Sequence, residues 1–265
     1  MNRLPLGWRI ATNVAAMAVL AFLIAPILAI IPASFNKASF IRLPPAAWST
    51  LWYGRFINDP EWLRALWNSL QLASLATLIA VPVGTLAALG LARSRAAGRL
   101  FCSALFIAPM VVPIIVVSVA IYRSALDVSM NGTLLALSLS HAVLALPFVV
   151  ISVGISLHAV NPAWSLAAAG LGAGPWRIFR TITLPHVMPG MVGGAVFSFM
   201  TSFDEAVLTI FLADYSTTTL PVKLWETVRL EFTPVLAVAA VVMTGLSVAL
   251  FVLVQIVIRQ TGDKA

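Results

Sequence analysis

The chain has 265 residues, of which 61% are hydrophobic and only 9% are charged. Soluble globular domains carry about 25% charged residues, so this chain cannot cover a water-facing surface of its own size with charge. An ordinary soluble protein is thereby excluded, and the mean hydropathy of +1.01 indicates that lipid surrounds most of the chain. The net charge of +7 comes from short basic clusters between apolar runs, which are typical of membrane topology signals and not of nucleic-acid binding.

Six stretches are long and apolar enough to cross a bilayer, since about 20 residues span the hydrocarbon core as a helix. They lack the short alternating segments of a β-barrel, so we expect an all-α integral membrane fold. The expected spans are about 10–31, 65–92, 100–122, 132–157, 189–212 and 234–258, within a single transmembrane domain over residues 1–265. The first run is too long for the apolar region of a signal peptide and lacks an A-x-A exit, so we interpret it as a span. Pro109 and Pro113 are positions where the third span can kink.

Lys and Arg residues near the span ends predict the orientation. One face of a six-span topology holds Arg3, Arg9, Arg93, Arg95, Arg99, Arg177, Arg180, Arg259 and Lys264. The opposite face holds Lys37, Arg42, Arg55, Arg64, Arg123, Lys223 and Arg229. Short loops count most in this rule, so the tight cluster between spans two and three predicts that the first face, with both termini, is cytoplasmic.

Two segments on the opposite face also carry a signal. The stretch 32–64 is rich in Trp, Tyr and Pro, which predicts a loop lying along the membrane surface. The stretch 220–232 has apolar residues at helical spacing, which predicts a short interfacial helix.

Catalytic and metal-binding patterns are missing from the sequence. It contains no Gly-Lys pair and therefore no phosphate-binding loop, so any ATP that drives this protein is hydrolysed by another polypeptide. His141, His158 and His186 are scattered and have no ligand-spaced partners, so we interpret them as hydrogen-bonded or interfacial histidines and expect no metal site. Cys102 lies in an apolar run and is expected to be a packed thiol. We expect no catalytic residue and no cofactor bound by this chain.

The segment 161–185, between spans four and five, differs from the other loops. Asn161-Pro162 is a helix-start signal, and the alanine-rich run that follows favours a short helix. Glycines at 170, 172 and 174 interrupt it, and Pro175, followed by Trp176, can begin a second helix. A helix–glycine–helix element with small side chains suits close docking into a groove of a partner.

The spacing in this segment resembles the signature loop of binding-protein-dependent ABC importer permeases, E-A-A, three residues, G, nine residues, I-x-L-P. The matching residues are Ala167, Ala168, Gly172, Ile182, Leu184 and Pro185. The glutamate of the signature falls on Leu166, which puts one polar contact of the loop in doubt. In that family the loop forms the coupling helix that docks into a cytoplasmic ATPase.

The resemblance implies a type I ABC importer permease fold, in which this chain forms half of the translocation pathway in a prokaryotic inner membrane. It implies a second permease subunit that forms a heterodimer with this chain, two ATPase subunits that bind ATP and Mg, and an extracytoplasmic substrate-binding protein. The residues Ser202 to Glu205 and 220–226 look like the second permease of spermidine/putrescine-type systems, which implies a polyamine or a similar small cationic substrate. Related permeases carry iron, thiamine, opines, amino acids or phosphonates, so the substrate stays open at this point. No nucleic-acid partner is expected.

Asp204 and Glu205 are the only acidic residues within an expected span. A carboxylate costs at least about 2.5 kcal/mol at the bilayer centre, so these side chains are expected to face protein or water. They can serve an interhelical contact, or one of them can line the substrate path. Adjacent helical residues diverge by about 100°, so only one can face the path squarely, and we favour Asp204.

Two other classes of function remain open on the sequence alone. A self-contained secondary transporter or channel would show related halves with broken helices at matching positions, and no convincing repeat is visible. A membrane enzyme would need a cluster of catalytic polar residues. Asp204 and Glu205 are the one candidate pair, but adjacent side chains on a helix point in different directions.

Overall fold

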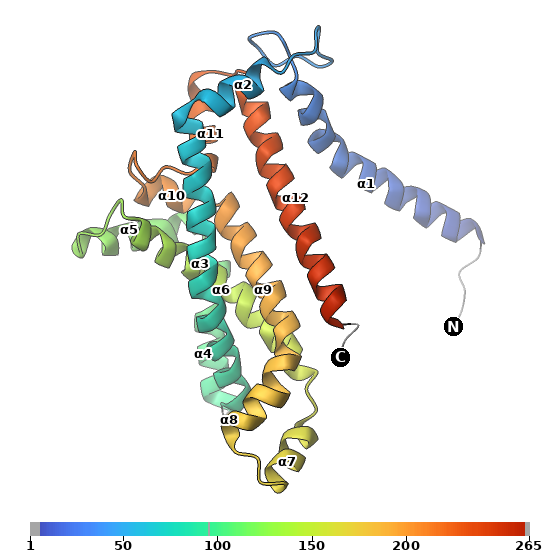
Figure 1. The fold of residues 1–265 in the computed structure, drawn as a ribbon, viewed down its shortest axis with the longest axis vertical. Coiled ribbons are helices and arrows are strands. Elements are labelled where there is room, and N and C mark those ends of the chain that lie inside the picture. Colours follow the sequence, from blue (N-terminus) through green and yellow to red (C-terminus); the bar gives the residue numbers. More distant parts are fainter. Residues whose placement is uncertain (1–5, 95, 263–265) are drawn as a thin grey trace. The chain divides into compact units, whose positions relative to one another are not determined.

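The structure, a computed structural model, describes residues 6–94 and 96–262, and this part of the chain is almost entirely helical (Figure 1). Five of its helices are long and apolar enough to cross a membrane, and a sixth crossing results if the bent pair α4 and α5 counts as one span. The all-α membrane fold expected from the sequence is therefore confirmed. Arg3, Arg95 and Lys264, used above to predict the orientation, lie outside the described residues, as does the side chain of Arg259.

The helices follow one another in a simple order along the chain. They are α1 (Leu6–Ser34), α2 (Leu51–Asn58), α3 (Pro60–Arg93), α4 (Ala96–Val111), α5 (Ile114–Asp127), α6 (Leu134–His158), α7 (Pro162–Gly170), α8 (Pro175–Ile178), η1 (Phe179–Thr183), α9 (Leu184–Asp204), α10 (Val207–Leu212), α11 (Leu220–Leu230) and α12 (Val235–Gly262). They form two compact units, one of residues 1–60 with 226–246 and the other of residues 61–225 with 247–265.

In the first unit, the segment after α1 is ordered by polar contacts. The Ser34 and Tyr53 hydroxyls lie 2.8 Å apart, and the Trp52 indole N–H donates to the Ala38 carbonyl at 3.1 Å. The Arg55 guanidinium lies 4.5 Å from the centre of the Trp52 ring. The aromatic-rich stretch predicted to be a surface loop therefore contains a short helix, α2, while its place along the membrane stays a prediction.

Small side chains form the core of the second unit, where α3, α6 and α9 meet. Buried residues of this cluster are Ala76, Ala80, Ala88, Ala142, Ala145, Val149, Val153 and Val187. α6 and α9 pack along their lengths (Figure 1). At Gly194 a methyl group would stand 3.0 Å from the Val149 Cα, so glycine permits this close approach. Small residues at the interface are the usual means of packing helices in a bilayer, where burial of apolar surface drives little association.

The third expected span is not one straight helix. α4 and α5 meet at a bend of 103°. Pro113 has an extended conformation with φ −52° and ψ 129° and precedes the first residue of α5. Because proline lacks an N–H and disfavours helical geometry in the residue before it, the helix ends at Val111. The third expected span, 100–122, is therefore bent near Pro113, one of the two positions predicted as possible kinks.

The fifth expected span, 189–212, also differs. The helical path begins earlier, at Pro175, and continues through a π-helical turn, η1, and α9 to Asp204. It then breaks, because Glu205 is extended with ψ 113°, and the separate helix α10 covers the remaining residues. Asp204 and Glu205 were expected within a continuous helix. They lie instead at the point where that helix breaks. The remaining spans correspond to α1, α3, α6 and α12, and α11 matches the expected helix at 220–232.

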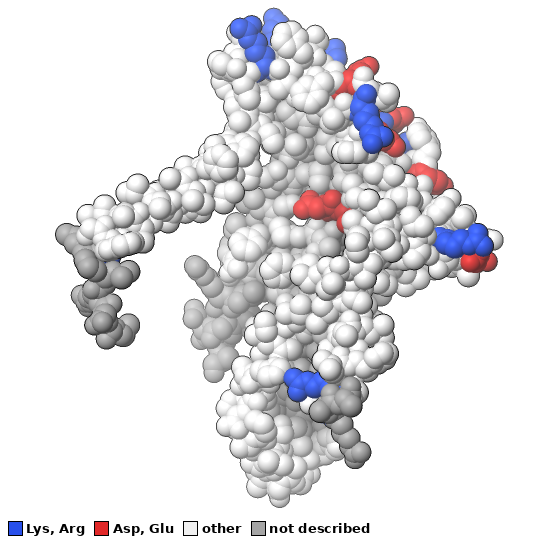
Figure 2. All heavy atoms as spheres, turned by 180° about the vertical axis from the view of Figure 1, so that it is seen from behind, with Lys and Arg blue, Asp and Glu red and all other residues white. Residues whose placement is uncertain are grey.

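In the second unit, the two ends of α3 contact segments that the predicted topology places on the same membrane face as each end. At one end Arg93 shares a pocket with Pro175 and Trp176, the residues directly before Arg177. At the other end the Lys223 ammonium pairs with the Glu61 carboxylate. Most of the surface seen in Figure 2 carries no charge, as expected for a chain embedded in lipid.

Candidate functional site

The loop between α6 and α9 begins with a capped helix. The Asn161 side-chain oxygen accepts a hydrogen bond of 2.9 Å from the Ala163 N–H, and Pro162 occupies the first turn of α7. The cap satisfies an N–H that has no partner within the helix, and proline fits a position where its missing N–H is not needed. The helix start predicted from Asn161-Pro162 is confirmed.

Gly172 ends this helix by adopting a left-handed conformation with φ +83°. The Ala173 N–H donates to the Ala168 carbonyl and the Gly172 N–H to the Ala169 carbonyl, both at 3.0 Å. These two bonds form a Schellman motif, which satisfies carbonyls at a helix end and requires a left-handed residue at this position. The spacing from the alanines to the glycine in the sequence motif therefore has a local structural cause.

The helices α7 and α8 and the turn between them present exposed apolar side chains. No residue of α7 or α8 is buried. Leu166 is 73% exposed, Leu171 89% and Trp176 71%. Of the other motif residues, Ala167 and Pro185 are exposed, while Ala168, Ile182 and Leu184 are half-buried. An exposed apolar patch of this kind is typical of a surface that another protein or a membrane covers.

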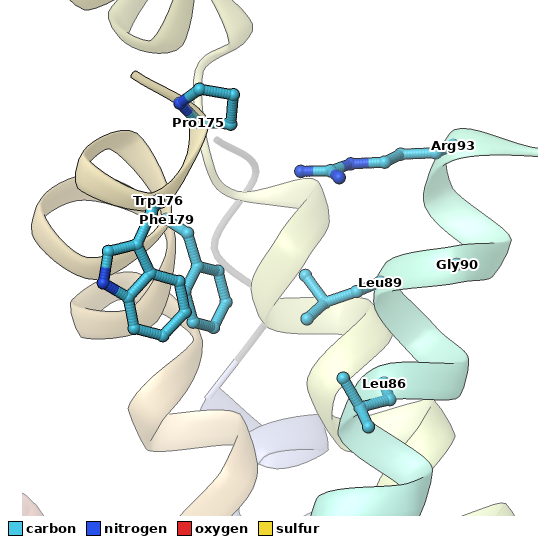
Figure 3. Close-up of a pocket in the computed structure, with 7 residues that line it drawn as sticks. All are labelled: Leu86, Leu89, Gly90, Arg93, Pro175, Trp176 and Phe179. Atoms are coloured by element: carbon cyan, nitrogen blue, oxygen red, sulfur yellow. The ribbon is translucent and has the colours of Figure 1, made fainter. Parts of the chain in front are cut away.

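The foot of the loop faces the end of α3 across a pocket of about 460 Å³ (Figure 3). On one side stand Leu86, Leu89, Gly90 and Arg93, which follow one face of the last turns of α3, and on the other stand Pro175, Trp176 and Phe179. The Trp176 and Phe179 rings are stacked, with centres 5.5 Å apart. Leu89 and Leu86 point toward these rings in Figure 3.

The second half of the loop continues directly into the fifth span. From Pro175 to Asp204 the helical path has no break, because the π-helical turn η1 accommodates Pro185 near the start of α9. The Trp164 ring also packs against the His186 ring, with centres 5.0 Å apart. The segment that begins at Pro175 is therefore continuous in structure with α9, which ends at Asp204.

At the other end of α9 the two acidic residues have different surroundings. Glu205 lies in the break, and its carboxylate accepts a 3.0 Å hydrogen bond from the Leu208 N–H in the first turn of α10. Asp204, the last residue of α9, is exposed and its carboxylate has no hydrogen-bond or ionic partner among the described residues. Glu205 therefore acts as a helix cap, and Asp204 is the carboxylate that remains accessible.

His141 joins the two sides of this break. Its Nδ1 lies 2.9 Å from the Ser202 hydroxyl of α9, and its Nε2 lies 3.0 Å from the Thr209 hydroxyl of α10. His141 is 1% exposed. The interpretation of this residue as a hydrogen-bonded histidine is confirmed, but its place at the break was missed, because its partners lie more than 60 residues away in the sequence.

His158 and His186 each bond to the carbonyl four residues earlier in their own helices, and Cys102 is a half-buried free thiol. Within residues 6–94 and 96–262 no three His, Cys, Asp or Glu side chains come together in a way that could hold a metal ion.

Comparison with known proteins identifies the chain's relatives. It is 32% identical over 250 residues to the spermidine/putrescine transport system permease protein PotC of Haemophilus influenzae, covering 94% of this chain and 97% of that protein. It is 29% identical over 255 residues to the putrescine transport system permease protein PotI of Escherichia coli K12, covering 92% and 89%. Among solved structures, a bacterial ABC transporter involved in import of the acidic polysaccharide alginate shares the fold, with a TM-score of 0.76, 16% identity and 96% of each chain covered.

The structural neighbours have the type I fold of ABC importer permeases, which confirms the fold class expected from the loop motif. The model of the family described as binding-protein-dependent transport system inner membrane component matches residues 80–262. Permeases of this family are not catalytic: they work in the inner membrane with a second permease, a separate ATPase subunit and a substrate-binding protein. The chain belongs to this family and is the multi-pass transmembrane permease subunit of an ATP-driven ABC importer.

Proposed function

We propose that this permease carries a polyamine, such as putrescine or spermidine, or another small organic cation of similar length. The observation that carries the proposal is the exposed, unpaired carboxylate of Asp204 at the break in the fifth span. The names of the relatives PotC and PotI support the same substrate class. The alginate transporter has the same fold and an acidic substrate, so the charge of the substrate depends on particular side chains and not on the fold.

The break itself favours a cation. The last carbonyls of a helix have no partner within it, and the helix dipole places about half a negative charge at that end. In this chain Asp204 is the last residue of α9, so its carboxylate adds to the negative charge at the carboxyl end of the helix. Interrupted helices in transporters use such carboxyl ends to coordinate cations. An ammonium group of a polyamine fits this combination, while Glu205 stays engaged with α10.

The loop from α7 to α8 is proposed to be the ATPase docking element. Its exposed apolar tip supports this assignment, with Leu166 in the position of the family's glutamate. We further propose a heterodimeric permease pair, two ATPase subunits that bind ATP and Mg while this chain binds no cofactor, and an extracytoplasmic binding protein. The loop face would then be cytoplasmic, with both termini on that side.

Uptake of labelled putrescine by the reconstituted complete transporter tests the proposal. Asp204→Asn keeps the size of the side chain and removes its charge, so uptake at low substrate concentration is expected to fall about tenfold or more. Glu205→Gln is the matched control, since it removes the neighbouring charge and keeps an oxygen that can accept from the Leu208 N–H. Uptake by Asp204→Asn at the wild-type rate, or an anionic substrate, would refute the assignment.

A further inference from the structure

The two helices at the break are held to a third helix by one side chain. His141 lies in the third turn of α6. It bonds to Ser202 before the break and to Thr209 after it. Ser202 is 4% exposed and Thr209 is fully buried. The three side chains form a buried polar contact in an apolar region, where a group without a partner would be costly.

The direction of each hydrogen bond follows from the number of protons available. The Thr209 hydroxyl donates to the Glu205 carbonyl at 3.1 Å. Because a hydroxyl has one proton, Thr209 must accept the second bond from the His141 Nε2–H. The Nδ1 of a neutral imidazole is then the acceptor, and the Ser202 hydroxyl donates to it. A single directed chain therefore runs from Ser202 through His141 and Thr209 to the backbone of Glu205.

This series of hydrogen bonds fixes the rotation of α9 about its axis. Helical residues are separated by about 100°, so Asp204 points about 200° away from Ser202, to the opposite side of the helix. Attaching Ser202 to α6 therefore turns Asp204 away from α6. On the other side of the break, apolar contacts of Leu208 and Leu212 with Leu137 and Leu144 hold α10 on α6, and Thr209 sets its register.

We propose that His141 is a positioning residue of the translocation path, which holds α9 and α10 in register at the break so that Asp204 is turned toward the path. The inference rests on the proposed role of Asp204 as the substrate-facing carboxylate. His141 does not touch the substrate in this account. It acts through Ser202 and Thr209, and its contribution is the direction in which the carboxylate points.

The test measures the position of residue 204 directly. Asp204→Cys is made in a Cys102→Ser background of the complete transporter, and its reaction with a small water-soluble thiol reagent is timed. Adding His141→Phe removes both hydrogen bonds and retains an aromatic ring. The labelling rate is expected to fall severalfold, because α9 can then rotate and turn residue 204 partly against its neighbours. His141→Gln, whose amide can accept from Ser202 and donate to Thr209, is expected to restore the rate.

A labelling rate unchanged or raised by His141→Phe would overturn the inference. If that variant does not assemble, Ser202→Ala and Thr209→Val each remove one bond, and unchanged labelling in both would have the same meaning. A second readout separates this inference from the proposed function. With Asp204 intact, His141→Phe is expected to raise the KM for putrescine about tenfold while the maximal rate changes less than about twofold. Slower labelling with an unchanged KM would retain the positioning role and refute the role of Asp204 in substrate binding.

Discussion

Gly84 of α3 lies so close to Val149 of α6 that a methyl group at position 84 would stand 2.7 Å from the Val149 Cβ. This is well inside normal contact distance, so the two helices depend on a hydrogen atom at this point. Val149 is fully buried and also lies against Gly194 of α9. One valine therefore fills the space left by glycines on two neighbouring helices.

Gly84→Ala is expected to destabilise the permease by about 1–3 kcal/mol, the usual effect of overpacking a tight interface. Thermal unfolding in detergent measures the effect. Gly154→Ala is the matched control, since a methyl group there meets no atom within 4 Å. Val149→Ala in the Gly84→Ala background should restore part of the lost stability, and a Gly84→Ala variant as stable as wild type would contradict the packing described here.

Gly172→Ala is expected to weaken the coupling loop, because a left-handed conformation costs a residue with a Cβ about 1–2 kcal/mol. Transport and substrate-stimulated ATP hydrolysis should both fall, while membrane insertion is unchanged. A bulky change, Gly172→Trp, should reduce both further if this surface is closely covered by the ATPase. Gly170→Ala serves as the control: this glycine is in α7, has no positive φ and has open space around its Cα. Equal effects of the alanine substitutions at 170 and 172 would argue against a conformational cause.

The loop motif and the break at Glu205 show what the sequence could and could not predict. The start and end of α7 depend on residues within the helix itself, Asn161 and Gly172, so local signals were sufficient. The bend at Pro113 had a local signal as well, but its size depends on how α5 packs against α10. The break at Glu205 has no proline or glycine, and its apolar surroundings resemble a continuous span. His141 stabilises it from another helix, which no local pattern reveals.

The family also decides between the functions that the sequence left open. A secondary transporter or channel would work without an ATPase, whereas this chain belongs to a family whose members depend on one. Two helices are interrupted, at Pro113 and at Glu205, and the segments that follow the interruptions, α5 and α10, pack on each other. Interrupted helices are thus present here without a secondary-transport mechanism.

Asp214 stabilises the turn after α10 in a way that depends on pH. Its carboxylate accepts bonds from the Ser216 N–H at 2.8 Å and the Thr217 N–H at 3.0 Å, and from both hydroxyls. The bond from the Ser216 side chain is the main cause that lowers the pKa of Asp214 below its ordinary value, with smaller contributions from Thr217 and the two backbone N–H groups. A group with a lowered pKa stabilises the fold above its unfolded pKa and loses that effect as the pH falls through the folded one.

Proteolysis of the turn is therefore expected to be slow at neutral pH and to accelerate below about pH 3.9, the ordinary pKa of an aspartate. Pepsin is suited to the acid range and a protease active near neutral pH to the rest, with each rate divided by the cleavage rate of an unfolded peptide at the same pH. Asp214→Asn should make the turn more susceptible at neutral pH and remove most of the pH dependence. Asp127→Asn is the control, because that carboxylate is exposed, pairs with Arg123 on α5 and takes no part in the bonds to Asp214. Identical pH profiles for wild type and Asp214→Asn would contradict the prediction.

Leu166 stands where the signature loop of the family has a glutamate, and its side chain is 73% exposed in the isolated chain. If the ATPase covers it with an apolar pocket, Leu166→Glu would bury an unpaired carboxylate and weaken the complex by several kcal/mol, on the order of 3. We expect this outcome, because Leu171 and Trp176 add further exposed apolar surface to the same loop.

Dissociation of the ATPase from the purified permease pair measures the effect, with Leu166→Met as a control that keeps an apolar side chain of similar size. The Glu variant should dissociate at least about a hundredfold faster than the Met variant, since about 2.7 kcal/mol corresponds to that ratio. Equal dissociation of the two variants would show that residue 166 lies at a wet edge of the interface, where either side chain is tolerated.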